Sequence, residues 1–148
     1  MRFLAVFLCL LGCSTVGPST IWDPHLESLA VNSRSFKAGR TPEAAVMVRA
    51  MASRVAGREA YALGIIVARS DLNYPKITAL KSFGRDLPYE RQDRHQIGRL
   101  RAEVGIIPMT RARFRALAAS GLTFRVYGKR GVYDAEVPAR LFHEVTLP

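Results

Sequence analysis

The chain has 148 residues, a formal net charge of +10 and a hydrophobic fraction of 49%. These values are ordinary for one globular domain, and the sequence contains no internal repeat or low-complexity tract. Its two cysteines, Cys9 and Cys13, lie at the start of the chain. The remaining sequence therefore excludes a disulfide framework, a cysteine metal site and a cysteine nucleophile.

The chain begins with a short cationic and apolar segment. Arg2 is followed by an apolar run, Phe3 to Gly12. A helix of this length rises about 15 Å, whereas a bilayer core needs roughly 20 apolar residues, so the run is too short to span a membrane. A positive residue, a brief apolar stretch and a small residue are typical of an export signal.

The end of this segment, Leu10-Leu11-Gly12-Cys13, resembles the lipobox of bacterial lipoproteins. The resemblance implies that Cys13 carries diacylglycerol and becomes the first residue of the mature chain, and that Ser14 favours delivery to the outer membrane. Two or more acyl chains would then hold the protein firmly. Two alternatives remain open: a chance match inside a signal peptide cut elsewhere, and an apolar N-terminal strand.

The resemblance divides the chain into three parts. We expect a lipoprotein signal peptide over 1–12, a lipidated tether over 13–20 and a single β-rich globular domain over 21–148. The expected location is the periplasmic face of the outer membrane. There the basic composition favours anionic envelope polymers as partners, although an arginine-rich codon bias would give the same charge.

The first part of the domain contains two ambiguous stretches. Residues 21–39 could hold one edge strand ending at Gly39. In the next stretch, Thr41, Pro42, Glu43 and Gly57 are placed like helix start and stop signals, so we predict a helix over 41–56. The alternative is a β-hairpin formed with the apolar run that follows.

The rest of the chain predicts mainly strands. Residues 61–70 are apolar on both faces, as in a central strand, whereas 87–97 are highly charged, as in an exposed edge strand. Further predicted elements are strands over 76–83 and 102–109, a helix over 110–121, a hairpin over 122–138 turning at 128–131, and an amphipathic segment over 139–147. We therefore expect an α+β fold, mainly an antiparallel, sandwich-like sheet with two or three short helices.

Five arginines form a candidate anion-binding site. Three lie in the first turns of the predicted helix and two a little upstream: Arg111, Arg113, Arg115, Arg99 and Arg101. Guanidinium groups and the free N–H groups of a helix start both suit phosphate. The alternative is a solvated face whose arginines pair with carboxylates such as Glu103.

Candidate catalytic and metal-binding residues are few. Asp93 and His95 would share one face of a strand and could act as an oriented base, but no nucleophile motif accompanies them. The three histidines, His25, His95 and His143, lack metal-ligand spacing, so we expect neither a metal nor another cofactor. Trp22, close to the tether, could rest at a membrane interface or pack on the domain edge.

These observations favour a lipid-anchored envelope protein that binds rather than catalyses, as a scaffold, accessory subunit or ligand-capturing module. Its expected partners are the membrane, through lipidated Cys13, and either anionic envelope polymers or another envelope protein. The first alternative is an envelope hydrolase using Asp93 and His95. The second is a basic nucleic-acid-binding protein, which export of the chain would make unexpected.

Overall fold

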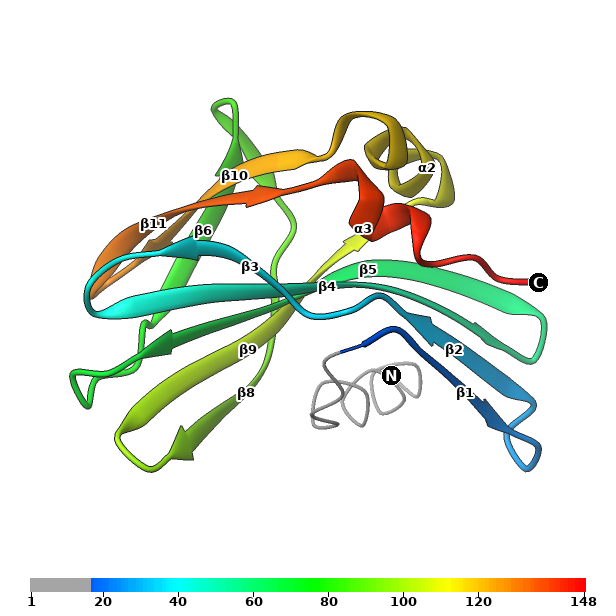
Figure 1. Ribbon diagram of the computed structural model, residues 1–148, viewed down its shortest axis with the longest axis horizontal. Helices are drawn as coiled ribbons and strands as arrows, with labels where there is room; N and C mark the ends of the chain where they lie inside the picture. The colour runs from blue at the N-terminus through cyan, green and yellow to red at the C-terminus, as the bar shows by residue number, and fades with distance from the viewer. Residues whose placement is uncertain (1–16) are drawn as a thin grey trace.

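The computed structural model describes residues 17–148. The predicted signal peptide, Cys13 and most of the predicted tether therefore lie outside the described residues. Within them, strands form two antiparallel sheets that face each other (Figure 1). The predicted α+β fold, a single domain dominated by an antiparallel sandwich with two short helices, is confirmed.

The larger sheet has seven strands. Its order is β1-β2-β4-β5-β9-β8, with β3 pairing on β4. The strands are β1 (Ser19–Asp23), β2 (Ser28–Asn32), β3 (Phe36–Arg40), β4 (Ala44–Val55), β5 (Arg58–Arg69), β8 (Glu90–Ile97) and β9 (Leu100–Met109). The strand β1 begins at Ser19, inside the range predicted as tether, so little chain separates the sheet from Cys13.

The smaller sheet has four strands in the order β11-β10-β6-β7. They are β6 (Ile77–Ser82), β7 (Arg85–Leu87), β10 (Leu122–Gly128) and β11 (Gly131–Val137). In β10 the buried side chains of Leu122, Phe124 and Val126 alternate with exposed ones, as the sequence predicts for a sheet with one wet face.

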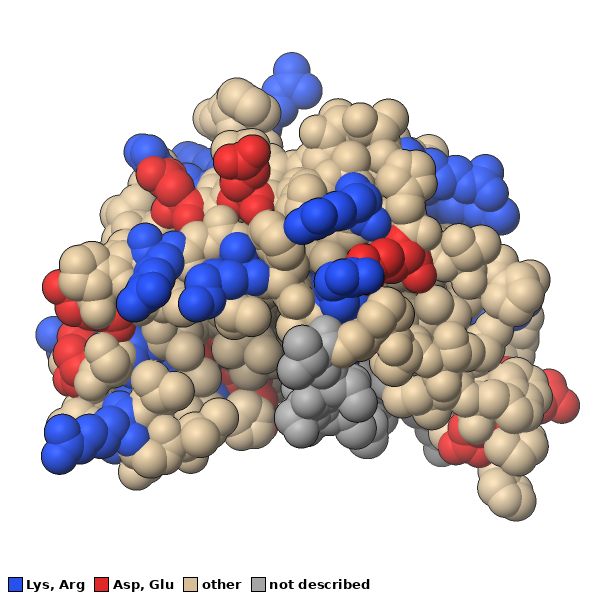
Figure 2. Space-filling model, in the orientation of Figure 1, with Lys and Arg blue, Asp and Glu red and all other residues tan. Residues whose placement is uncertain are grey.

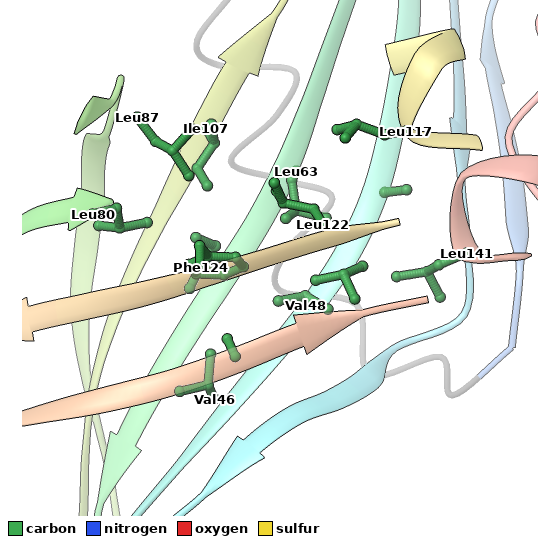
Figure 3. Close-up of a cluster of buried hydrophobic side chains, with 14 of the residues drawn as sticks. Val46, Val48, Leu63, Leu80, Leu87, Ile107, Leu117, Leu122, Phe124 and Leu141 are labelled. Carbon is green, nitrogen blue, oxygen red and sulfur yellow. The ribbon is translucent and has the colours of Figure 1, made fainter. Parts of the chain in front are cut away.

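The main core lies between the two sheets, and Figure 3 shows part of it. Val46 and Val48 of β4, Leu63 of β5 and Phe124 of β10 point into the same apolar layer. Each is at most 2% exposed. Full burial of such a side chain stabilises the fold by about 1.5–3 kcal/mol, so this layer is the main source of stability.

Two helices cover one end of this core: α2 (Arg111–Ser120) and α3 (Ala139–His143). The predicted cap of α2 is confirmed, because the Thr110 Oγ1 atom accepts a hydrogen bond from the Arg113 backbone N–H at 3.2 Å. Phe114 of α2 lies edge-to-face on Phe142 of α3, with ring centroids 5.2 Å apart. The helices therefore pack on each other as well as on the sheet.

The predicted helix over 41–56 is wrong. This segment forms β4, which pairs along its whole length with β5 as a hairpin, the alternative that the sequence left open. Ala56 and Gly57 make the turn, both with positive φ (47° and 77°), which matches a two-residue hairpin loop. Thr41 caps a turn instead of a helix, since its Oγ1 atom accepts from the Ala44 N–H at 3.1 Å.

Most other predicted elements are confirmed, with adjusted ends. All but the last residue of the predicted run 61–70 falls within β5, a central strand, and the charged run 87–97 contains β8 at a sheet edge. Residues 21–39 hold more strand than the single one predicted, because the end of β1, all of β2 and most of β3 lie there. Their short polar and apolar alternation gave too little pattern to separate two strands.

The seven-stranded sheet has an inner face toward the core and an outer face turned away from it. Side chains alternate between the two faces along each strand. On β4, Val46, Val48 and Ala50 face inward, while Met51 belongs to a separate cluster with Ala30, Ala62 and Ile106. This cluster, which we call the outer-face cluster, lies on the face opposite the helices and the smaller sheet.

Candidate functional site

The structure divides the five candidate arginines between two distant places. Arg99 and Arg101 lie at the turn between β8 and β9, while Arg111, Arg113 and Arg115 lie on α2 beyond the other end of β9. The strand between Arg101 and Met109 spans about 27 Å at roughly 3.4 Å per residue. The five residues therefore cannot hold one small anion together.

The arginines of α2 are exposed, and one already has a carboxylate partner. The Arg111 Nη1 atom lies 3.5 Å from the Glu59 Oε2 atom. Glu59 also receives hydrogen bonds from Arg54 and the Tyr61 hydroxyl, and these bonds lower the pKa of its carboxyl group. With Thr110 capping the helix start and Arg111 beside Glu59, this end of α2 is an exposed polar surface, which fits the solvated-face alternative better than an anion site.

The turn between β8 and β9 carries a different kind of arginine. Ile97 pairs with Leu100, so Gly98 and Arg99 form the turn itself. Arg101 Nη1 donates to the carbonyl oxygens of Gly98 and Leu100 at 3.1 and 3.2 Å, which leaves its positive charge without a recorded carboxylate partner among residues 17–148. Arg99 is exposed at the tip. Two cations thus stand close together on a projecting hairpin.

Basic and acidic side chains are interspersed over much of the visible surface (Figure 2). Basic groups project at the lower left, the end of the molecule where the turn between β8 and β9 lies in Figure 1. Acidic groups gather at the lower right, where the turn between β1 and β2 lies. The positive charge is therefore not spread evenly over the two ends of the sheet.

Asp93 and His95 do meet, as two residues on one face of a strand should. The His95 Nε2 atom lies 3.2 Å from the Asp93 Oδ2 atom, and both side chains are about half exposed. The other recorded partner of Asp93 within residues 17–148 is the backbone N–H of Arg94, at 2.7 Å. Among residues 17–148 no third catalytic group is placed beside this contact on the edge strand β8, and a catalytic site needs more than two half-exposed side chains.

Glu103, named above only as a possible surface partner for arginines, is a buried acid. It is fully buried on the inner side of β9, where it accepts hydrogen bonds from Arg94 Nε (3.2 Å), the Tyr89 hydroxyl (3.3 Å) and the Ile77 N–H (3.2 Å). Burial, together with the nearby carboxylate, raises the pKa of Tyr89. The partners come from β8, from the smaller sheet and from the loop between β7 and β8, so Glu103 ties the two sheets together.

Gly105, two residues along β9, makes room for the Tyr89 side chain that contacts Glu103. A Cβ atom at this position would lie 2.3–2.6 Å from atoms of the Tyr89 ring. Only a glycine lets the Tyr89 side chain approach β9 this closely while its hydroxyl reaches Glu103. A charged residue and a glycine inside an apolar run, "AEVGII", are the only sequence signal for this arrangement.

A second buried charge, Arg69, is held at the end of β5. It donates to both carboxylate oxygens of Asp71, to the Tyr133 hydroxyl and to the Arg130 carbonyl. The guanidinium group keeps the pKa of Asp71 well below its usual range. These contacts fasten the turn between β10 and β11 to the larger sheet, so Arg69 has a structural role.

The smaller sheet has a shallow surface pocket of about 260 Å³. Lys81, Phe83, Gly84, Thr123, Phe124, Arg125, Tyr127 and Asp134 line it. Its cations are paired: Arg125 Nε lies 2.6 Å from Asp134 Oδ1, and Lys81 Nζ lies 3.4 Å from Asp86 Oδ1. The pocket therefore offers no surplus charge for an anionic ligand.

No group of three or more His, Cys, Asp and Glu side chains within residues 17–148 could hold a metal ion. Neither helix in this range has the length and hydropathy of a membrane-spanning segment. Cys13, the predicted lipid attachment site, lies outside the described residues.

No protein-family model, curated protein or solved structure matches the chain.

Proposed function

We propose that the chain is a lipid-anchored lipoprotein of the bacterial envelope, whose β-rich domain works by binding and not by catalysis. The observation that carries the proposal is Leu10-Leu11-Gly12-Cys13 at the end of a signal-like run. The fold supports it: β1 begins at Ser19, so only a short tether, residues 13–18, would separate the lipid from the domain. The domain itself contains no cysteine that could compete for modification.

A binding role is favoured over hydrolysis by the surroundings of Asp93 and His95. Their contact at 3.2 Å is the one observation in favour of a hydrolase. The two side chains are half exposed on an edge strand. Among residues 17–148, neither a nucleophile nor a second acid contacts them. A scaffold, accessory subunit or ligand-capturing module remains the preferred role, at the periplasmic face of the outer membrane.

The proposal is tested with two cysteine variants of the full chain in a bacterium that processes lipoproteins. Cys13→Ser should abolish labelling by a fatty-acid analogue and release the protein from the membrane fraction, because its lipid attachment site is lost. Cys9→Ser should change neither result, since Cys9 would leave with the signal peptide. Equal labelling and equal membrane retention of the Cys13→Ser variant and the unaltered chain would overturn the proposal.

A further inference from the structure

Large apolar side chains are exposed mainly at projecting turns of the molecule. Among residues 17–148, those at least 41% exposed are Ile21, Trp22, Leu26, Leu72, Phe83, Ile97, Leu100 and Val132. Five of the eight fall at two turns of the seven-stranded sheet. We call these the β1–β2 tip (residues 21–27) and the β8–β9 tip (residues 96–101).

The β8–β9 tip combines apolar and cationic groups. Ile97 is 65% exposed and Leu100 is 41% exposed, on either side of the turn formed by Gly98 and Arg99. Arg101 is held next to them by its bonds to backbone carbonyls. Apolar side chains that project beside arginines suit a surface with negative headgroups above a hydrocarbon layer.

The β1–β2 tip supplies apolar surface with an aromatic group. Trp22 is 60% exposed, Leu26 is 55% exposed and Ile21 is 41% exposed. Asp23 and Glu27 lie in the same turn, and Asp23 accepts a hydrogen bond from the His25 N–H at 2.9 Å. This tip therefore offers an indole ring for the water–lipid interface, while attraction to anionic lipid must come from the β8–β9 tip.

Both tips lie on the side of the molecule from which the tether would leave. They occupy opposite corners of the seven-stranded sheet, because β1 and β8 are its two edge strands and the turns lie at opposite ends. The sheet is bent, so that both tips lie along the lower edge of Figure 1, with the start of β1 between them. The β6–β7 turn, with Phe83, lies at the opposite, upper edge.

The length of the tether limits how far the domain can stand from its anchor. Six residues, Cys13 to Pro18, span at most about 20 Å when fully extended. The β1–β2 tip lies at the far end of the five-residue strand β1, which directly follows that tether, so a bilayer anchored at Cys13 is within its reach. The outer-face cluster, with Met51 and Ala62, lies on the face of the sheet between the two tips.

We propose that the domain rests on the bilayer through these two tips, with Trp22 and Leu26 in the interface at one end. Ile97 and Leu100 enter the interface at the other end, where Arg99 and Arg101 meet anionic headgroups. This proposal rests on the proposed lipid anchor and adds an orientation to it. The smaller sheet, its surface pocket and the Phe83 turn then face away from the membrane, toward whatever the domain binds.

The chain contains a single tryptophan, so Trp22 reports its own surroundings by fluorescence. The full-length gene product, purified from its cell membrane, is reconstituted into vesicles of phosphatidylglycerol and phosphatidylethanolamine. We expect the Trp22 emission to shift to the blue relative to that in dilute detergent. We also expect strong quenching by lipids brominated on their acyl chains and weak quenching by acrylamide in the water.

Matched variants test the second tip. Ile97→Asp and Leu100→Asp should remove most of the quenching of Trp22 by brominated lipid, because one of the two supports of the domain is lost. Phe83→Asp, at a more exposed apolar residue on the far side, should leave it unchanged. All three sites are exposed, and an unchanged urea midpoint for each variant separates loss of lipid contact from loss of fold.

Two results would overturn this orientation. Trp22 could be quenched by acrylamide in vesicles as strongly as in detergent, or Phe83→Asp could be the variant that lowers quenching by brominated lipid. The intact mass of the same sample tests the anchor separately. A lipidated chain with unquenched Trp22 refutes only the orientation, whereas an unlipidated chain with quenched Trp22 refutes only the anchor.

Discussion

The middle of the seven-stranded sheet and its two edge hairpins are built from different kinds of sequence. The central strand β5 has buried side chains on both faces, and Leu63, Ile65 and Val67 are completely buried. The edge strand β8 is exposed along nearly its whole length, and β1 is mostly exposed. The middle of the sheet therefore supplies most of the stability, whereas the exposed edge hairpins can contact another surface.

The largest effect should come from the middle of the sheet. Leu63→Ala removes a completely buried side chain from the core between the sheets, and such a change costs about 2–5 kcal/mol of the free energy of unfolding. Leu100→Ala, at the exposed β8–β9 tip, should cost no more than about 0.5 kcal/mol. Urea unfolding followed by circular dichroism measures both. Similar losses for the two variants would contradict the division between middle and edge.

A smaller effect is expected where the edge strand is tied to the core. Arg94 of β8 donates to the fully buried carboxylate of Glu103, so Arg94→Met leaves that carboxylate one partner short. Loss of a hydrogen bond to a charged group should cost about 1–3 kcal/mol. Arg91→Met, at an exposed position of the same strand, is the control. Equal urea midpoints for the two variants would show that Glu103 does not hold β8 to the core.

The turn between β4 and β5 gives a prediction in which the sign matters more than the size. Ala56 has a φ of 47°, a conformation that costs an alanine more than a glycine. Ala56→Gly should therefore raise the free energy of unfolding by about 1 kcal/mol. If residues 41–56 formed a helix instead, the same substitution would lower it by about 1 kcal/mol. A thermal unfolding curve distinguishes the two signs.

The smallest effect concerns the dependence of stability on acid. Because the Arg69 guanidinium lowers the pKa of Asp71 in the folded state, this carboxylate stabilises the fold above about pH 4, where it is also ionised in the unfolded chain. The contribution is lost as the pH falls further and Asp71 becomes protonated. The Asp71→Asn variant should thus be less stable than the unaltered chain at neutral pH, and its free energy of unfolding should fall less as the pH is lowered. Urea midpoints measured across this range test it, with Asp86→Asn as an exposed control.

Most of the fold follows from local patterns in the sequence, and the one large error has a physical cause. The alternation in residues 122–128 predicts β10, and the caps Thr110 and Gly121 predict α2. Both elements have one face toward the core and one toward water, which makes their periods visible in the sequence. Residues 44–55 are buried on both faces of β4, so no strand alternation is visible, and Ala44, Met47, Val48, Met51 and Val55 also fall at helical spacing. Thr41, Pro42 and Gly57 stand where helix start and stop signals are expected, but the same residue types are also common in turns.

The site was less predictable than the fold. Arg101 and Arg111 are near in sequence but are placed at opposite ends of β9, because an extended strand carries its ends far apart. The contact between Asp93 and His95 follows from a spacing of two on a strand. The partners of Glu103 come from three separate segments, and no local pattern could show that they meet.

The intact mass of the protein from its native cell shows whether Cys13 carries the proposed lipid anchor. We predict a chain that begins at Cys13, without residues 1–12, and carries the added mass of a diacylglycerol group. A chain that still begins at Met1 and has a free thiol at Cys13 would contradict the claim.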